Sequence, residues 1–122
     1  MGPSAARIEQ MKIPGVSGAE SLSIEGQVTL GQVTALRASL LDAIEKTSAT
    51  KLVLELSGIG KIDTSGAALL AEGFLAGRKR GIRVLLCAPS ASVLRLFELA
   101  GFQDVLDACC SDPAKIRERL SA

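Results

Sequence analysis

The sequence predicts an α/β domain with a mixed, mainly parallel β-sheet of roughly four to five strands and about four α-helices packed on it. Short segments with the length and pattern of strands alternate with longer segments whose apolar residues recur at helical spacing. Residues 51–56 are apolar at nearly every position, which is typical of a central strand covered on both faces. With 122 residues, 48% of them hydrophobic, the chain has the size and apolar content of one domain.

The first half of the chain predicts two strands and an amphipathic helix. Residues 1–20 form an N-terminal segment with scattered Gly, Pro and Ser, in which Ile8–Ile13 is a candidate edge strand. Residues 21–28 alternate apolar and polar side chains, which indicates a half-buried strand. Residues 32–46 place apolar side chains on one stripe, as in a helix packed on a sheet. The stripe consists of Val33, Leu36, Leu40, Ala43 and Ile44.

The alternation continues after the central strand. A second helix begins at Thr64 and is expected to end at Gly81, because glycine suits the left-handed residue that follows a helix. Residues 82–87 form the next predicted strand. A third helix opens at Ser90 and stops at Gly101, and the aromatic residue that follows is expected to fold back on its last turn.

The C-terminal part predicts one more strand and one more helix. Residues 104–106 are expected to form a short strand. Asp112 then provides a cap and Pro113 a first-turn proline, both typical of a helix start. Ile116 and Leu120 give this last helix one apolar contact per turn.

Composition argues against nucleic acid and membrane partners. The formal net charge is +1, and three Phe with no Tyr and no Trp leave few aromatic platforms for bases. The apolar runs are short and interrupted by charge, so we expect no direct membrane insertion. The N-terminus also lacks the continuous apolar core of a signal peptide. These observations predict a cytoplasmic protein.

The reactive side chains argue against an enzyme, a cofactor and a metal site. The absence of His removes the commonest general base, and no Ser or Cys has an evident partner to activate it. A zinc site would need Cys87, Cys109 and Cys110 together with a carboxylate. We expect these thiols to be reduced and mostly packed, with Cys87 a core residue rather than a sensor.

Two further segments have an ordinary structural interpretation. Gly58–Lys61 invites comparison with a phosphate-binding loop, but Ile62 replaces the Ser or Thr of that motif and Glu55 its first Gly. We therefore expect a plain loop there. A basic cluster near the end of the second helix suits a solvated helix C-terminus, with an acidic partner as the alternative. The cluster consists of Arg78, Lys79, Arg80 and Arg83.

The segment Asp63-Thr64-Ser65-Gly66 follows the apolar strand and begins the second helix. Asp63 has the short acceptor side chain that caps helices, and Ala67–Phe74 contains no β-branched residue. The turn should therefore expose Thr64 and Ser65 at a helix N-terminus. From these residues alone, the turn is either a simple cap or a place for chemistry or a switch.

Three segments together resemble the STAS domain of bacterial anti-sigma-factor antagonists. They are Asp63–Gly66, Gly81 before a strand that ends in Cys87, and Ser90–Gly101 with its Leu-Phe-x-x-x-Gly end. The resemblance covers roughly residues 20–120. It divides the chain into an N-terminal segment, residues 1–20, and a STAS domain, residues 21–122.

The resemblance also implies site residues and partners. In that family the hydroxyl residue after the Asp accepts a phosphate from an anti-sigma factor that is also a serine/threonine kinase. By position this is Thr64, with Ser65 as the backup and Asp63 and Gly66 shaping the turn. The unmodified protein would sequester the anti-sigma factor and so regulate transcription, whereas the phosphorylated protein would release it. A phosphatase that restores the hydroxyl is a further candidate partner.

A second group of STAS proteins offers an alternative function for this chain. Many antagonists have a Gly-Glu-Leu/Ile-Asp turn where this chain has Gly26-Gln27-Val28-Thr29, so two carboxylates are missing. Asp-Thr turns also occur in stressosome proteins and in STAS subunits of bacterial ABC phospholipid transporters. The chain could therefore be a regulatory subunit bound to a transporter ATPase or permease.

The second helix also predicts a partner surface. Ala67, Leu70, Ala71, Phe74 and Gly77 share the face expected to meet the sheet. The opposite face is unusually apolar for a solvated helix, so we expect a partner to cover it, with a homodimer or the N-terminal segment as alternatives. This face consists of Ala68, Leu69, Glu72, Leu75, Ala76 and Lys79.

Overall fold

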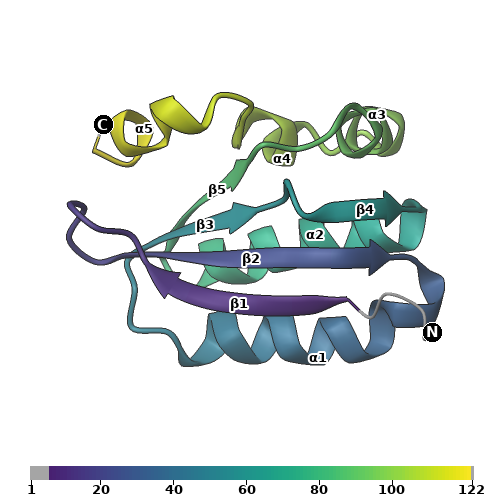
Figure 1. Ribbon diagram of the computed structural model, residues 1–122, viewed down its shortest axis with the longest axis horizontal. Coiled ribbons are helices and arrows are strands. Elements are labelled where there is room, and N and C mark those ends of the chain that lie inside the picture. Colours follow the sequence, from purple (N-terminus) through teal and green to yellow (C-terminus); the bar gives the residue numbers. More distant parts are fainter. Residues whose placement is uncertain (1–5, 122) are drawn as a thin grey trace.

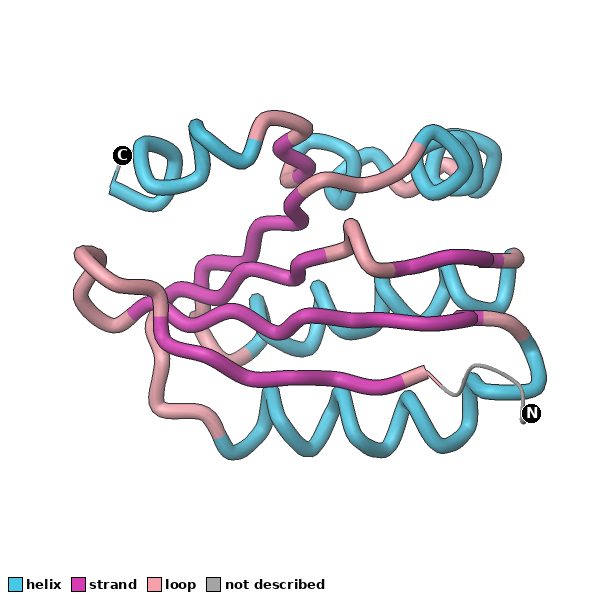
Figure 2. Tube along the Cα trace, in the orientation of Figure 1, coloured by secondary structure: helices cyan, strands magenta, loops and turns pink. Residues whose placement is uncertain are grey.

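The computed structural model describes residues 6–121, which form a six-stranded mixed sheet flanked by helices (Figures 1 and 2). The strands are β1 (Arg7–Lys12), β2 (Ala19–Val28), β3 (Lys51–Glu55), β4 (Ile59–Ile62), β5 (Arg83–Cys87) and β6 (Cys109–Cys110). Their order is β1-β2-β3-β5-β6, and β4 pairs with the far end of β2. Only the β1–β2 pair is antiparallel among these strands. The predicted α/β class and mainly parallel sheet are confirmed, and β1 is the expected edge strand.

The helices cover the sheet unequally. They are α1 (Leu30–Lys46), α2 (Thr64–Lys79), α3 (Ala91–Ala100), α4 (Gln103–Asp107) and α5 (Ile116–Ser121), the last preceded by a 3₁₀ turn at Pro113–Lys115. Buried residues of α1, α2 and α3 share one core cluster with Leu54 and Leu86 of the central strands. Val53 and Leu85 point to the opposite face, where they pack with α5. The apolar run of β3 is therefore buried on both faces, as predicted.

The loop predicted at Gly58–Lys61 is wrong, because most of this segment lies in β4. β2 is ten residues long and extends beyond β3, so its last residues have an edge that β4 occupies. A bulge between Gly26 and Gln27 shifts the register of this pairing. The half-buried residues of β4 are Ile59 and Ile62, which lie three positions apart, so the period-two signal of a strand is missing.

The strand predicted at residues 104–106 is also wrong, because this segment forms α4. Val105 is buried in the main core, and Gln103 donates a side-chain hydrogen bond to Asp107 one turn later at 2.8 Å. The chain pairs with β5 only afterwards, through β6. A segment this short carries too few residues to separate a helical from an alternating pattern.

The predicted helix ends are confirmed. Gly81 and Gly101 have φ of 79° and 74°, in the left-handed region that favours glycine. The Phe102 amide donates to the Phe97 carbonyl at 3.0 Å, and the two rings lie 6.4 Å apart, so the aromatic residue does fold back on α3. Ser90 caps α3 by accepting from the Val93 amide at 3.2 Å.

Candidate functional site

The Asp63 turn lies between the end of β4 and the start of α2. Asp63 Oδ1 accepts a hydrogen bond from the Gly66 amide at 3.0 Å, which is the N-cap geometry predicted from the sequence. Its other oxygen, Oδ2, accepts from the Leu30 amide at 2.9 Å, at the first residue of α1. The hydrogen bond from Gly66, followed by that from Leu30, holds the pKa of Asp63 below its ordinary value. One carboxylate thus caps two helices.

Gly66 is fixed in this turn by a close contact with β2. It is buried, and a Cβ built on it would lie 2.0 Å from the Val28 carbonyl oxygen and 2.9 Å from Ile62 Cγ1. Any larger residue would push the start of α2 away from the strand end. The turn therefore needs glycine for space rather than for its backbone angles.

The two hydroxyl residues of the turn differ in exposure. Thr64 is the first residue of α2 and is exposed, whereas Ser65 is half-buried. The helix N-terminus presents free backbone N–H groups and the positive end of the helix dipole beside them. Thr64 is thus the more accessible of the two hydroxyl residues.

The predicted partner face of α2 needs one correction. With about 3.6 residues per turn, Thr64, Ala68 and Leu75 share one stripe, and the structure exposes all three. Leu69 is not on this surface, because only 2% of it is exposed. It turns toward the flank where α1 packs, the same flank on which Gly73 meets Leu40 closely. On the remaining face Lys79 is exposed, and Glu72 and Ala76 are half-buried.

Glu72 is already engaged within the chain. Arg37 of α1 donates from Nε to Glu72 Oε1 at 2.8 Å and from Nη2 to Oε2 at 2.5 Å. These hydrogen bonds raise the pKa of Arg37 and lower that of Glu72. Farther along, Arg80 Nη1 donates to the carbonyls of Ile44 and Thr47 at the end of α1. The two helices are therefore joined at both ends and in the middle.

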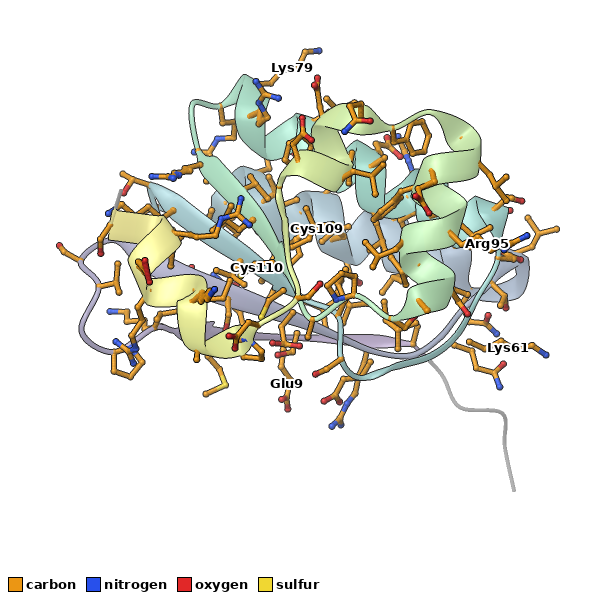
Figure 3. All side chains as sticks on the ribbon, turned by 90° about the horizontal axis from the view of Figure 1, so that it is seen from above. Glu9, Lys61, Lys79, Arg95, Cys109 and Cys110 are labelled. Carbon is orange, nitrogen blue, oxygen red and sulfur yellow. The ribbon has the colours of Figure 1, made fainter. Side chains whose placement is uncertain are left out.

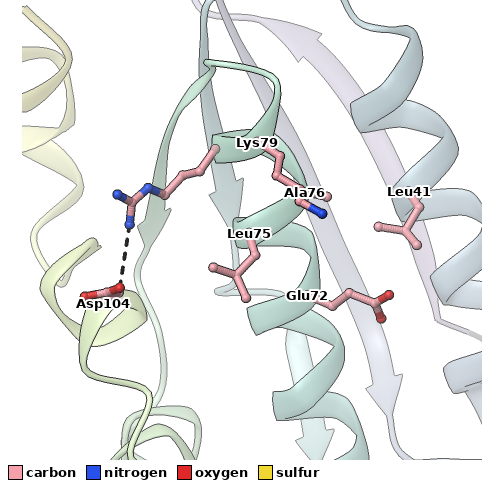
Figure 4. A pocket seen from close by; sticks show the side chains of 7 residues that line it. Leu41, Glu72, Leu75, Ala76, Lys79 and Asp104 are labelled. Atoms are coloured by element: carbon pink, nitrogen blue, oxygen red, sulfur yellow. Dashed lines mark ion pairs between the residues drawn. The ribbon is translucent and has the colours of Figure 1, made fainter.

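A hollow of about 690 Å³ lies over the C-terminal half of α2 (Figure 4). Leu75 lines this hollow and also a smaller one of about 280 Å³, which extends to residues 101–105. The larger hollow is lined by Leu41, Glu72, Leu75, Ala76, Arg78, Lys79 and Asp104. It therefore includes four of the predicted partner-face residues.

Two of the three thiols have pKa values raised by burial. Burial raises the pKa of the Cys87 thiol to about 12 and that of Cys109 to about 11, so neither is a ready nucleophile. Cys110 is also buried, and all three cysteines are free; Figure 3 labels the adjacent pair. Within residues 6–121, no three Cys, Asp or Glu side chains converge as metal ligands would.

The comparison with known families decides what kind of domain carries this site. The family model of the STAS domain matches residues 10–120. This chain belongs to the STAS domain family. The resemblance expected from the Asp63 turn and the α3 end is confirmed.

Solved structures share the fold of this STAS domain. The anti-sigma factor antagonist SpoIIAA of Bacillus matches with a TM-score of 0.69 at 18% identity in its unphosphorylated form, over 96% of both chains. Its phosphorylated form matches with a TM-score of 0.66 at 17% identity, over 95% of this chain and 99% of that one. An anti-sigma factor antagonist from Mycobacterium paratuberculosis matches with a TM-score of 0.73 at 16% identity, over 97% of this chain and 94% of that one.

A transporter contains the same fold. The murine anion transporter Slc26a9 matches with a TM-score of 0.75 at 15% identity. The match covers 98% of this chain but 22% of the transporter, so the STAS domain corresponds to one part of that protein. In the described residues of this STAS domain, no helix combines the length and apolar character needed to cross a bilayer.

Several residues that surround the candidate site of this STAS domain were missed from the sequence. Leu30 is 73% exposed beside the Asp63 turn, and Arg37, Leu41 and Asp104 complete the surroundings of the α2 face. Each comes from another helix, so only the packing of α1 and α4 against α2 brings it there. The basic cluster is partly used internally, since Arg78 pairs with Asp104 and Arg80 binds the end of α1.

Proposed function

We propose that this STAS domain is an anti-sigma-factor antagonist, a non-enzymatic cytoplasmic switch that binds an anti-sigma factor and releases it when Thr64 is phosphorylated. The observation that carries the proposal is the exposed Thr64 at the start of α2, directly after the Asp63 cap. Support comes from SpoIIAA, an antagonist with the same fold whose structure is known in unphosphorylated and phosphorylated forms. The partner would be an anti-sigma factor with serine/threonine kinase activity, which links the domain to control of transcription.

The electrostatics of the turn suit such a switch. A phosphate would add about 1.5 to 2 negative charges to Thr64. The N-terminus of α2 favours this charge, so the fold should accept it. A partner docked over the turn would instead meet added bulk and charge next to the Asp63 carboxylate. Ser65 is the second acceptor, at a half-buried position.

The docking surface would extend from the turn along α2. Ala68 is exposed one turn after Thr64, and Leu75 is 52% exposed two turns farther on. Leu30 adds an exposed apolar side chain next to the turn. We assign this surface to the partner, with Glu72, Ala76 and Lys79 at its far end and without the buried Leu69.

The proposal is tested by binding and modification with the anti-sigma-type kinase of the same organism. The unmodified chain should bind the kinase, and ATP should release it with phosphate detected by mass spectrometry at Thr64. Thr64→Ala should stay bound in the presence of ATP, and Thr64→Glu should bind about tenfold more weakly or worse. Thr34→Glu, at an exposed position in α1, is the matched control. Unchanged binding by Thr64→Glu would overturn the switch.

The regulatory subunit of a bacterial ABC phospholipid transporter is the second candidate. Gln27 and Thr29 replace the two carboxylates common in antagonists, and the exposed Leu75 suits a permanent apolar interface. In that case the full chain would capture a transporter ATPase or permease from a cell extract and no kinase. The same pull-down therefore separates the two functions.

A further inference from the structure

The larger hollow over α2 offers apolar contact far from the phosphorylation candidate. Leu75 lies eleven residues after Thr64, about 16 Å along the helix axis at a rise of about 1.5 Å per residue. Leu41 of α1 and Ala76 supply further apolar surface, and both are only half-buried. Figure 4 shows Leu75, Glu72 and Lys79 along α2, with Leu41 and Asp104 facing them from the neighbouring helices.

The charges around this hollow are paired except for one. Arg37 binds Glu72 with two hydrogen bonds, and Arg78 lies 3.8 Å from Asp104. Lys79 has no ion-pair partner in the described part of the chain, and it is exposed on the rim of the hollow. The unpaired charge at an otherwise apolar and neutralised surface is thus positive.

The lining also limits the kind of backbone that can dock. All of the residues around the larger hollow belong to α1, α2 or α4. Their backbone groups are used within helices, so the surface offers no strand edge to which an extended peptide could add. Recognition must therefore depend on side chains, as when an amphipathic helix lies in a groove between helices.

We propose that this hollow docks an amphipathic helix of a partner protein, with a large apolar side chain against Leu75 and a carboxylate one turn away facing Lys79. Leu75 and Lys79 are themselves one turn apart, so a helix lying along α2 meets both at matching spacing. The inference rests on the proposed function for the identity of the partner. It adds an anchoring contact separate from the turn that phosphorylation would change.

A phage-displayed library of amphipathic helical peptides, randomised on the apolar face and its flanks, tests this docking without the natural partner. Selected on the full chain, the peptides should be enriched in Asp or Glu one turn from a Leu, Ile or Phe. Lys79→Glu should weaken the best acidic peptide by on the order of fivefold and select Lys or Arg at that position instead. Leu75→Asp should abolish selection, whereas Leu99→Asp, at an exposed position on α3, should not.

Two results would overturn this docking. One is an equal frequency of acidic residues, or no enrichment at all, on the wild-type and Lys79→Glu proteins. The other is self-association of the chain that Leu75→Asp abolishes, since a second copy would then occupy the hollow. Failure of the switch would show in kinase release at Thr64 instead, so the two proposals fail separately.

Discussion

The carboxylate of Asp63 accepts a hydrogen bond from the amide of Leu30, and this bond connects the N-terminus of α2 to the N-terminus of α1. The distance from Leu30 N to Asp63 Oδ2 is 2.9 Å, and the second oxygen of the same carboxylate binds Gly66 at 3.0 Å. Thr29, the residue before α1, makes no side-chain cap of its own. The N-terminus of α1 therefore depends on a residue of the turn that carries Thr64.

Removing this carboxylate should destabilise both helices. We expect Asp63→Ala to lower the free energy of unfolding by about 2 kcal/mol, because each lost cap typically costs about 1 kcal/mol. Urea denaturation followed by circular dichroism measures the change. Asp42→Ala removes an exposed carboxylate that pairs with Lys46, which is also exposed, and it should cost less than about 0.5 kcal/mol. Equal losses in the two variants would contradict the double cap.

The same contacts make stability depend on acid pH. The pKa of Asp63 is lower in the folded protein than the value of about 3.9 expected in the unfolded chain. Its contribution should be complete above about pH 5 and should be lost as the pH falls through the folded pKa. The difference in unfolding free energy between wild type and Asp63→Asn, measured from pH 7 to 3, should therefore shrink below about pH 4. A difference that grows toward low pH would contradict this assignment.

Gly66 and Gly31 form a matched pair of glycines in the first turns of α2 and α1. Gly66→Ala places a methyl group 2.0 Å from the Val28 carbonyl, so we expect a loss of about 3 kcal/mol or more in unfolding free energy. Among the described residues, nothing lies within 4 Å of the same position at Gly31, and Gly31→Ala should stabilise the protein by up to about 1 kcal/mol. Thermal unfolding measures both changes. Similar effects at both positions would show that the close contact with Val28 does not matter.

Sequence patterns predicted those parts of the fold that depend on neighbours along the chain. The Asp63 cap, the Gly101 stop with Phe102 packed back, and the fully buried β3 each involve residues within one turn or one strand. β4 was missed because its existence depends on the free edge of a longer strand far away in sequence. Helix formation in α4 likewise depends on the burial of Val105 in the shared core.

The candidate site also combines features set by neighbours along the chain with features set by residues far away in sequence. The position of Thr64 follows from a local turn, but the bonds from Asp63 to Leu30 and from Arg37 to Glu72 join residues 33 and 35 apart. No spacing in the sequence indicates such pairs. They are consequences of α1 packing beside α2, and this packing also buries Leu69.

The Arg37–Glu72 pair should contribute modestly to the joining of α1 and α2. Its side chains are 53% and 40% exposed, so solvent weakens the attraction despite the two-point geometry. A double-mutant cycle with Arg37→Ala and Glu72→Ala should give a small favourable coupling in unfolding free energy, near the low end of what surface ion pairs contribute. The coupling should fall as salt is raised to about 1 M, because exposed charges are then screened. A coupling that salt leaves unchanged would mean that packing rather than charge joins the pair.

Substitutions at Leu69 and Leu75 should separate the effect of α2 on stability from its effect on partner binding. Leu69 is buried between α2 and α1, so Leu69→Ala should lower the unfolding free energy by about 2 to 5 kcal/mol. Leu75 is 52% exposed, and Leu75→Ala should change stability by less than about 0.5 kcal/mol while weakening partner capture. Chemical denaturation and a pull-down on the same two variants measure both effects. Because the two changes remove the same atoms from one helix, a large stability loss in Leu75→Ala would place this side chain in the core and not on the docking surface.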